Sequence, residues 1–204
     1  RERAQDAFEA ANELVRVGDA SIAAAFTARQ PDVGPCVALL RQGRSTLATT
    51  LMMFKVLGVN CLGTAYALSV QYLEGVKLGD TQATVAGLFP AVLFLLLSKS
   101  EPREALSAAR PHASVFCGYA AVSVAAQSAV HLALLASAAA AAREAAAAPA
   151  RTPDPDGDFE PGVVNTAAYL VNFYVTVVSF LVNYVGEPFT CRLARNRGLS
   201  RALV

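Results

Sequence analysis

Four long apolar stretches constrain the fold of this chain more than any other feature. They cover residues 47–73, 81–98, 113–142 and 163–185. An α-helix rises 1.5 Å per residue, so about 20 apolar residues cross a hydrocarbon core about 30 Å thick. Three of the stretches exceed that length, and the second lies at its lower limit. The pattern predicts an all-α, polytopic membrane protein with four transmembrane helices.

The composition excludes the main alternatives to a membrane protein. Charged residues make up 16% of the 204 residues, against about 25% in an ordinary soluble domain, and 54% are hydrophobic. A soluble helical bundle would therefore have too little polar surface, and disordered chains are poor in apolar residues. Because the net charge is only +1, nucleic acid is not an expected partner, whereas the lipid bilayer is.

The charges that flank the apolar stretches predict an orientation. Arginine and lysine are frequent before residue 47, in 99–112 and after residue 185, whereas 143–162 is mainly acidic. By the positive-inside rule we expect the three basic segments in the cytosol, including the N-terminus. The chain starts at Arg1 rather than at a methionine, and we expect it to be a processed chain or a piece of a longer protein.

Polar side chains inside the apolar stretches are the candidate functional residues, because they are costly in lipid. Lys55 has two interpretations, a pocket or coupling charge and a side chain that snorkels to the headgroups. Asn60 and Thr64 lie one helical turn apart and line a pocket or form interhelical hydrogen bonds. In the fourth stretch, Asn165 and Asn172 are pocket candidates. They belong to a polar stripe that must face protein or a water-filled cavity: Asn165, Asn172, Thr176, Ser179 and Asn183.

Neither catalytic nor metal-binding motifs are found in the sequence. A Walker P-loop, a Gly-x-Ser-x-Gly elbow, an HExxH helix and a dinucleotide fingerprint are all absent. The four cysteines form no Cys-x-x-Cys pair, so we expect neither a zinc site nor disulfides. Gln127 and His131 lie one turn apart in the third stretch, and interhelical hydrogen bonding is the expected role of both.

Several short sequences, in order along the chain, resemble the type 5A branch of the P-type ATPases. The longest is GDASIAAAFT at residues 18–27, where the family usually has GDASIAAPFT. Others follow as QGRSTL at 42–47, NCL at 60–62 and YLEGVK at 72–77, and further matches reach residue 184. This branch comprises transmembrane-helix dislocases of the endoplasmic reticulum, formerly labelled cation-transporting ATPases.

The resemblance implies a domain organisation. Residues 1–45 would end the cytosolic phosphorylation domain and its linker, 46–198 would form transport-domain helices, and 199–204 would begin a further membrane helix. The family's DKTGT and GDGxND motifs are not in this chain. The resemblance therefore implies that the chain holds no catalytic residue, binds no cofactor and is inactive alone.

The resemblance also implies the role of the parent protein. With ATP and Mg²⁺ it would couple ATP hydrolysis to transport or extraction of transmembrane helices from the endoplasmic-reticulum membrane. Its partners would be the remainder of the same polypeptide and a transmembrane-helix or cation substrate. Three alternatives stay open: a P-type ATPase that moves cations, a four-span scaffold or assembly subunit without ATPase coupling, and an autonomous channel or exporter.

Overall fold

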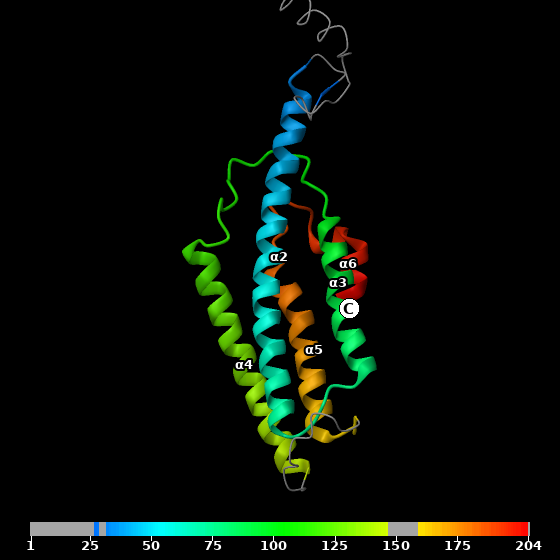
Figure 1. Cartoon of the computed structure of the whole chain (residues 1–204). Coiled ribbons are helices and arrows are strands. Elements are labelled where there is room, and N and C mark those ends of the chain that lie inside the picture. Colours follow the sequence, from blue (N-terminus) through cyan, green and yellow to red (C-terminus); the bar gives the residue numbers. More distant parts are fainter. Residues whose placement is uncertain (1–26, 29–31, 147–158, 204) are drawn as a thin grey trace, which may run out of the picture. The chain divides into compact units, whose positions relative to one another are not determined.

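The computed structural model describes residues 27–28, 32–146 and 159–203, and within them every regular element is a helix (Figure 1). Four of these helices are long and apolar enough to cross a membrane, judged by length and composition. The predicted all-α class with four membrane-spanning helices is thereby confirmed. The elements are α2 (Gly34–Leu73), α3 (Asp80–Ser98), α4 (Gly118–Ala146), α5 (Val163–Asn183), the 3-10 turn η1 (Leu193–Arg195) and α6 (Arg197–Leu203).

Helix α2 is longer than the sequence pattern predicted. The apolar pattern predicted a helix over 47–73, but the 40 residues of α2 begin at Gly34 and continue without a break into that stretch. Asp32 accepts a hydrogen bond from the backbone N–H of Gly34 (2.9 Å), and Pro35 fits the first turn, where its missing N–H costs nothing. No proline follows before Leu73, so nothing in the chain ends the helix early.

Two other helix limits also differ from the sequence prediction. Helix α4 begins at Gly118 rather than at residue 113, since the Ser114 hydroxyl accepts the N–H of Phe116 (3.1 Å) and turns the chain there. Its alanine-rich end stays helical to Ala146, because alanine has the highest helix propensity. Helix α5 ends at Asn183, and residues 147–158 lie outside the described residues, as do 1–26 of the expected phosphorylation-domain segment.

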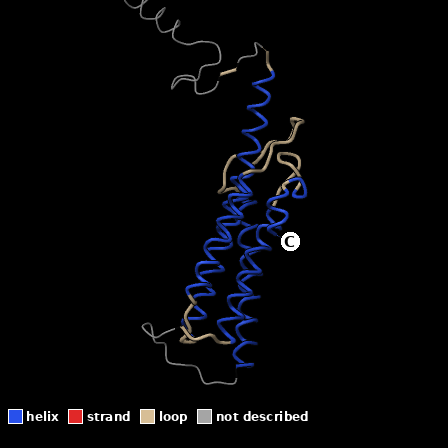
Figure 2. The backbone as a smooth tube through the Cα atoms, turned by 90° about the vertical axis from the view of Figure 1, so that its right-hand side faces the viewer, coloured by secondary structure: helices blue, strands red, loops and turns tan. Residues whose placement is uncertain are grey.

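The chain divides into two units, residues 1–40 and 41–204, and the packing described from here on is within the second. In that unit, α2 and α5 run between α4 and α3 (Figure 1). The backbone N–H of Val185 contacts the sulfur of Met52 (2.8 Å) near one end of this pair, while Val70 packs with Val164 near the other. Helices α2 and α5 are therefore antiparallel, and the connecting loops gather at the two ends of the bundle (Figure 2).

The apolar core lies mainly where α2, α3, α5 and α6 meet. Helix α3 contributes only two buried residues, Leu93 and Leu97, so most of its surface is available to lipid or to other protein. The first cluster consists of Met52, Val56, Leu93, Leu97, Phe180, Leu199 and Leu203, and a second joins α2, α4 and α5 through Val70, Ala139, Ala142 and Val164.

Three basic segments meet at one end of the bundle, which we call the arginine-rich end. It comprises α2 from Arg41 to Lys55, the loop 99–117 and the segment 184–197. Arg41 donates to the carbonyl of Glu104, and Arg44 donates to the carbonyls of Ser107 and Ala109. An isolated β-bridge between Pro102 and Thr190 joins the loop to the segment that follows α5. The segments expected on one side of the membrane thus lie together.

Candidate functional site

One face of α5 carries the polar stripe that the sequence pattern predicted. Asn165 and Asn183 are 18 residues apart, which at 3.6 residues per turn is about five full turns. Both are buried, with 0% and 1% of their surface exposed. The stripe therefore faces the other helices, and it meets a different one at each of three levels. We call the stripe and its contacts the polar seam.

At the first level, Asn165 binds α3. The amide nitrogen of Gln82 donates to Oδ1 of Asn165 (2.9 Å), and Nδ2 of Asn165 donates to Oε1 of Gln82 (3.2 Å) and to the carbonyl of Lys77 (2.9 Å). The same Gln82 oxygen accepts the backbone N–H of Gly79 at the start of α3 (3.1 Å). All hydrogen-bonding groups of the Asn165 amide are thus used within the bundle.

At the opposite level, near the arginine-rich end, Asn183 binds α4. Nε2 of Gln127 donates to Oδ1 of Asn183 (3.1 Å), and Nδ2 of Asn183 donates to Oε1 of Gln127 (2.6 Å). Each amide also has a local partner, Ser123 for Gln127 and the carbonyl of Ser179 for Asn183. The interhelical bond expected of Gln127 is confirmed. In the same helix His131 is buried, and its Nδ1 has no partner among the described residues.

At the middle level, Asn172 meets α2. Nδ2 of Asn172 donates to the hydroxyl of Thr64 (3.3 Å), a long bond between two partly exposed side chains. A Cβ atom on Gly63 would lie 3.3 Å from Oδ1 of Asn172. The absence of a side chain at Gly63 therefore lets α2 approach α5 closely at this level.

Asn60 lies one turn from Thr64 on α2, and it is the least satisfied of the neutral residues predicted for the site. Both polar atoms of its amide are buried, and neither has a hydrogen-bond partner within the described residues. An unpaired buried amide costs about 1–3 kcal/mol. Among the neutral residues of the predicted set, Asn60 is thus the one whose side chain has hydrogen-bonding capacity to spare.

Lys55 lies apart from the polar seam. Only 5% of its surface is exposed, and its Nζ atom lies 4.8 Å from the ring centroid of Tyr119 at the start of α4. A cation at this distance from an aromatic face is attracted by the ring. The structure therefore brings Thr64 and Asn172 together, leaves Asn60 unpaired, engages Asn165 with α3 and directs Lys55 toward α4.

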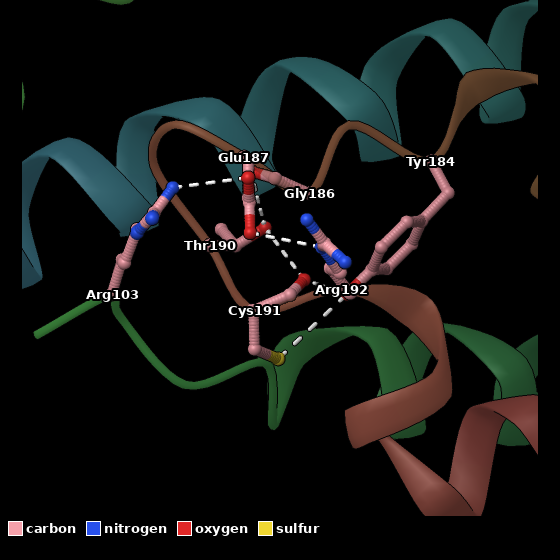
Figure 3. A network of polar contacts seen from close by, with 7 residues as sticks. All are labelled: Arg103, Tyr184, Gly186, Glu187, Thr190, Cys191 and Arg192. Atoms are coloured by element: carbon pink, nitrogen blue, oxygen red, sulfur yellow. Dashed lines mark hydrogen bonds and ion pairs between the residues drawn. The ribbon is translucent and has the colours of Figure 1, made fainter.

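A polar network after α5 was not anticipated from the sequence (Figure 3). Arg103 and Arg192 approach the exposed carboxylate of Glu187, at 3.1 and 2.9 Å. The hydrogen bond from Arg192, together with the positive charges of both arginines, lowers the pKa of Glu187 below its ordinary value. The buried Thr190 hydroxyl binds the carbonyl of Val185 (2.8 Å). The network ties the loop 99–117 to the segment after α5.

Sequence reasoning expected interhelical bonds of Gln127 and Thr64, but it did not identify which residues of the stripe they would meet. Gln82 was not among the candidate residues, although its place in the first turn of α3 makes it a capping residue. Tyr119 lies near the start of the third predicted stretch, and nothing in the sequence indicated its contact with Lys55. Each contact joins residues far apart in the chain, and spacing along one helix does not identify such pairs.

The fold and the polar seam define a polytopic helical membrane protein whose helices are joined by amide and hydroxyl contacts. No family model matches the chain. Over 191 residues, 94% of the chain, it is 48% identical to the "Probable manganese-transporting ATPase PDR2" of Arabidopsis thaliana. It is 40% and 39% identical, over 93% of its length, to proteins named "Endoplasmic reticulum transmembrane helix translocase" from Saccharomyces cerevisiae and Schizosaccharomyces pombe.

These similarities confirm the resemblance to the type 5A branch of the P-type ATPases over nearly the whole chain. The coverage of the relatives is much smaller, because the chain spans 16% of the length of each of these three proteins.

Proposed function

We propose that this chain forms part of the transport domain of a P-type ATPase that moves transmembrane helices out of the endoplasmic-reticulum membrane. The observation that carries the proposal is the 39–40% identity, over 93% of the chain, with proteins named as helix translocases. ATP, Mg²⁺ and the phosphorylated aspartate belong to the remainder of the polypeptide. The chain itself supplies membrane helices and no catalytic group.

The amide of Asn60, unpaired within the described residues, supports a role for this residue in holding substrate. A transmembrane helix that is out of place carries polar groups that need partners in lipid, where an unsatisfied group costs several kcal/mol. The Asn60 amide has both a donor and an acceptor without a partner among the described residues. It is therefore suited to a hydrogen bond with a polar side chain of a passing helix. Thr64 and Asn172, joined by a long bond, lie one turn further along and complete the proposed pocket.

A cation substrate is the second candidate, and the name of the plant relative, at 48% identity, favours it. Manganese prefers carboxylate, carbonyl and water oxygens. Asn60, Thr64 and Asn172 offer neutral oxygens that suit hydrogen bonding at least as well as metal binding. ATPase stimulation of the full-length protein separates the two, since a helix translocase responds to a transmembrane peptide and a manganese pump responds to Mn²⁺.

The test of the pocket is Asn60→Leu in the full-length protein, with the exposed neighbour Cys61→Leu as its control. We expect Asn60→Leu to keep expression and phosphoenzyme formation but to lose most of the ATPase stimulation by a substrate helix. The control should keep that stimulation. A parallel loss of thermal stability and turnover would make Asn60 a packing residue, and unchanged stimulation would remove it from the pocket.

We also propose that the arginine-rich end faces the cytosol and that the N-terminus lies on that side. The grouping of Arg41, Arg44 and Arg103 with the basic tail supports this orientation through the positive-inside rule. A glycosylation acceptor inserted near Pro153 should be modified in the endoplasmic-reticulum lumen, and one near Ser107 should stay unmodified. The opposite pattern of modification would invert the proposed topology.

A further inference from the structure

A pocket of about 200 Å³ lies at the arginine-rich end, apart from the polar seam. Its walls come from α2, the loop 99–117, the start of α4 and the segment after α5. Since one water occupies about 30 Å³ of liquid, the pocket has room for several waters or a small polar group. The residues that decide its chemistry are Lys55, Arg110, His112 and Tyr119, with Met52 and Phe189 among its apolar walls.

Lys55 makes the pocket electropositive. Only 5% of the surface of Lys55 is exposed. Its only close polar or aromatic contact with a described residue is the ring of Tyr119, at 4.8 Å. A buried ammonium without a counter-ion is costly, and such groups are normally paired with an anion. The structure therefore contains a built cationic site whose anion is missing from the described residues.

The loop 99–117 adds further donors to the same pocket. Arg44 holds the carbonyls of Ser107 and Ala109, and the next residue, Arg110, lines the pocket. Arg110 forms no ion pair with a described residue, and His112 stacks on Tyr119 with 5.3 Å between ring centroids. Among the described residues that line this pocket, none carries a carboxylate. The three nitrogen-bearing side chains are thus arranged around one space with no negative charge to balance them.

We propose that this pocket binds the phosphate group of a membrane phospholipid. Lys55 and Arg110 indicate that the ligand is an anion, since charge-assisted hydrogen bonds to phosphate are among the strongest that these side chains form. The lipid follows from position. Lys55 belongs to an apolar membrane helix, near the end where basic residues meet the headgroups, and Phe54 and Leu57 beside it are exposed for acyl chains. This site goes beyond the proposed function, because it is separate from the substrate pocket.

The experiment titrates delipidated full-length protein in detergent with dioleoyl phosphatidic acid and follows its melting temperature. Dioleoylglycerol has the same chains without phosphate, and glycerol 1-phosphate has the phosphate without chains. We expect phosphatidic acid to raise the melting temperature and neither control compound to do so. Lys55→Leu should weaken the apparent affinity for phosphatidic acid about tenfold or more, because it removes a charge-assisted bond.

Two further variants keep the test decisive. Arg110→Gln, on the exposed rim, should weaken the affinity about threefold even if Lys55→Leu fails to fold. Lys99→Leu, which removes an exposed lysine at the same end, should respond like the wild type.

Three outcomes would contradict the proposal. Equal affinity in wild type and Arg110→Gln, or an equal response to dioleoylglycerol, would overturn the phosphate assignment. Equal binding of glycerol 1-phosphate would overturn the lipid assignment in favour of a free anion. If none of the three compounds raised the melting temperature, the proposal would be overturned. The counter-ion of these side chains would then be an acidic group elsewhere in the polypeptide.

Discussion

The reciprocal amide pair between Gln127 and Asn183 should be the strongest single interhelical link in the bundle. Asn183 is 1% exposed, and two hydrogen bonds join its amide to that of Gln127. Asn183→Leu removes both and leaves the Gln127 oxygen without its partner. The expected loss is about 1–3 kcal/mol, the cost of an unsatisfied buried polar group. Gln127→Leu should destabilise by a similar amount for the same reason.

The double variant Asn183→Leu/Gln127→Leu should cost less than the sum of the two single variants. When both partners are removed, no buried amide is left unpaired. Measured coupling energies in membrane proteins average about 0.6 kcal/mol per hydrogen bond and reach about 1.7. Two bonds of good geometry therefore predict a coupling energy of about 1–2 kcal/mol.

The assay is reversible unfolding of the protein in mixed micelles, analysed as a double-mutant cycle. The matched control cycle uses Thr64→Val and Asn172→Leu, which break a single bond of 3.3 Å between partly exposed groups. Its coupling energy should be close to zero. The reasoning would be refuted if both cycles gave the same coupling energy, or if the Gln127–Asn183 cycle gave less than about 0.3 kcal/mol.

The remaining predictions concern a surface carboxylate and a close helix approach. Glu187→Gln should lower the melting temperature at neutral pH. The difference from wild type should vanish as the pH falls, because contact with Arg192 lowers the pKa of Glu187, and its stabilising effect is present above the ordinary value and lost below the lowered one. Gly63→Leu should destabilise by about 1–3 kcal/mol through overlap with Asn172, whereas Gly87→Leu, with no atom within 4 Å of its added Cβ, should change unfolding by less than about 0.5 kcal/mol.

Much of the fold could be predicted from the sequence, because membrane helices are recognised by their length and apolar composition. The four spans and the stripe on α5 follow from one-dimensional patterns. The continuous start of α2 was missed, since Arg41, Gln42 and Arg44 separate its first residues from the apolar stretch, and only the lack of a helix-breaking proline indicated that it continues.

The candidate site was less accessible than the fold. Asn60 and Asn165 looked alike in the sequence, as amides inside apolar helices. In the structure Asn165 meets Gln82 and is fully bonded, whereas Asn60 meets no partner among the described residues. That difference depends on which helix lies opposite, a property of the assembled bundle rather than of either helix. The pocket at Lys55 could not be predicted either, because its other donors come from the loop 99–117, which is distant in the sequence.

The three levels of the polar seam restrict how the bundle can move. The three asparagine side chains of the seam project from one side of α5. They form hydrogen bonds with three different helices, Asn165 with α3, Asn172 with α2 and Asn183 with α4. Turning α5 about its own axis would break all three sets together, so its torsional freedom is blocked. Splaying α3 outward breaks the contact at Gln82 and the packing of Leu93 and Leu97 in the apolar core, but it leaves the contacts of Asn172 and Asn183 in place. Outward tilt of α3 therefore breaks one level of the polar seam, whereas rotation of α5 breaks all three.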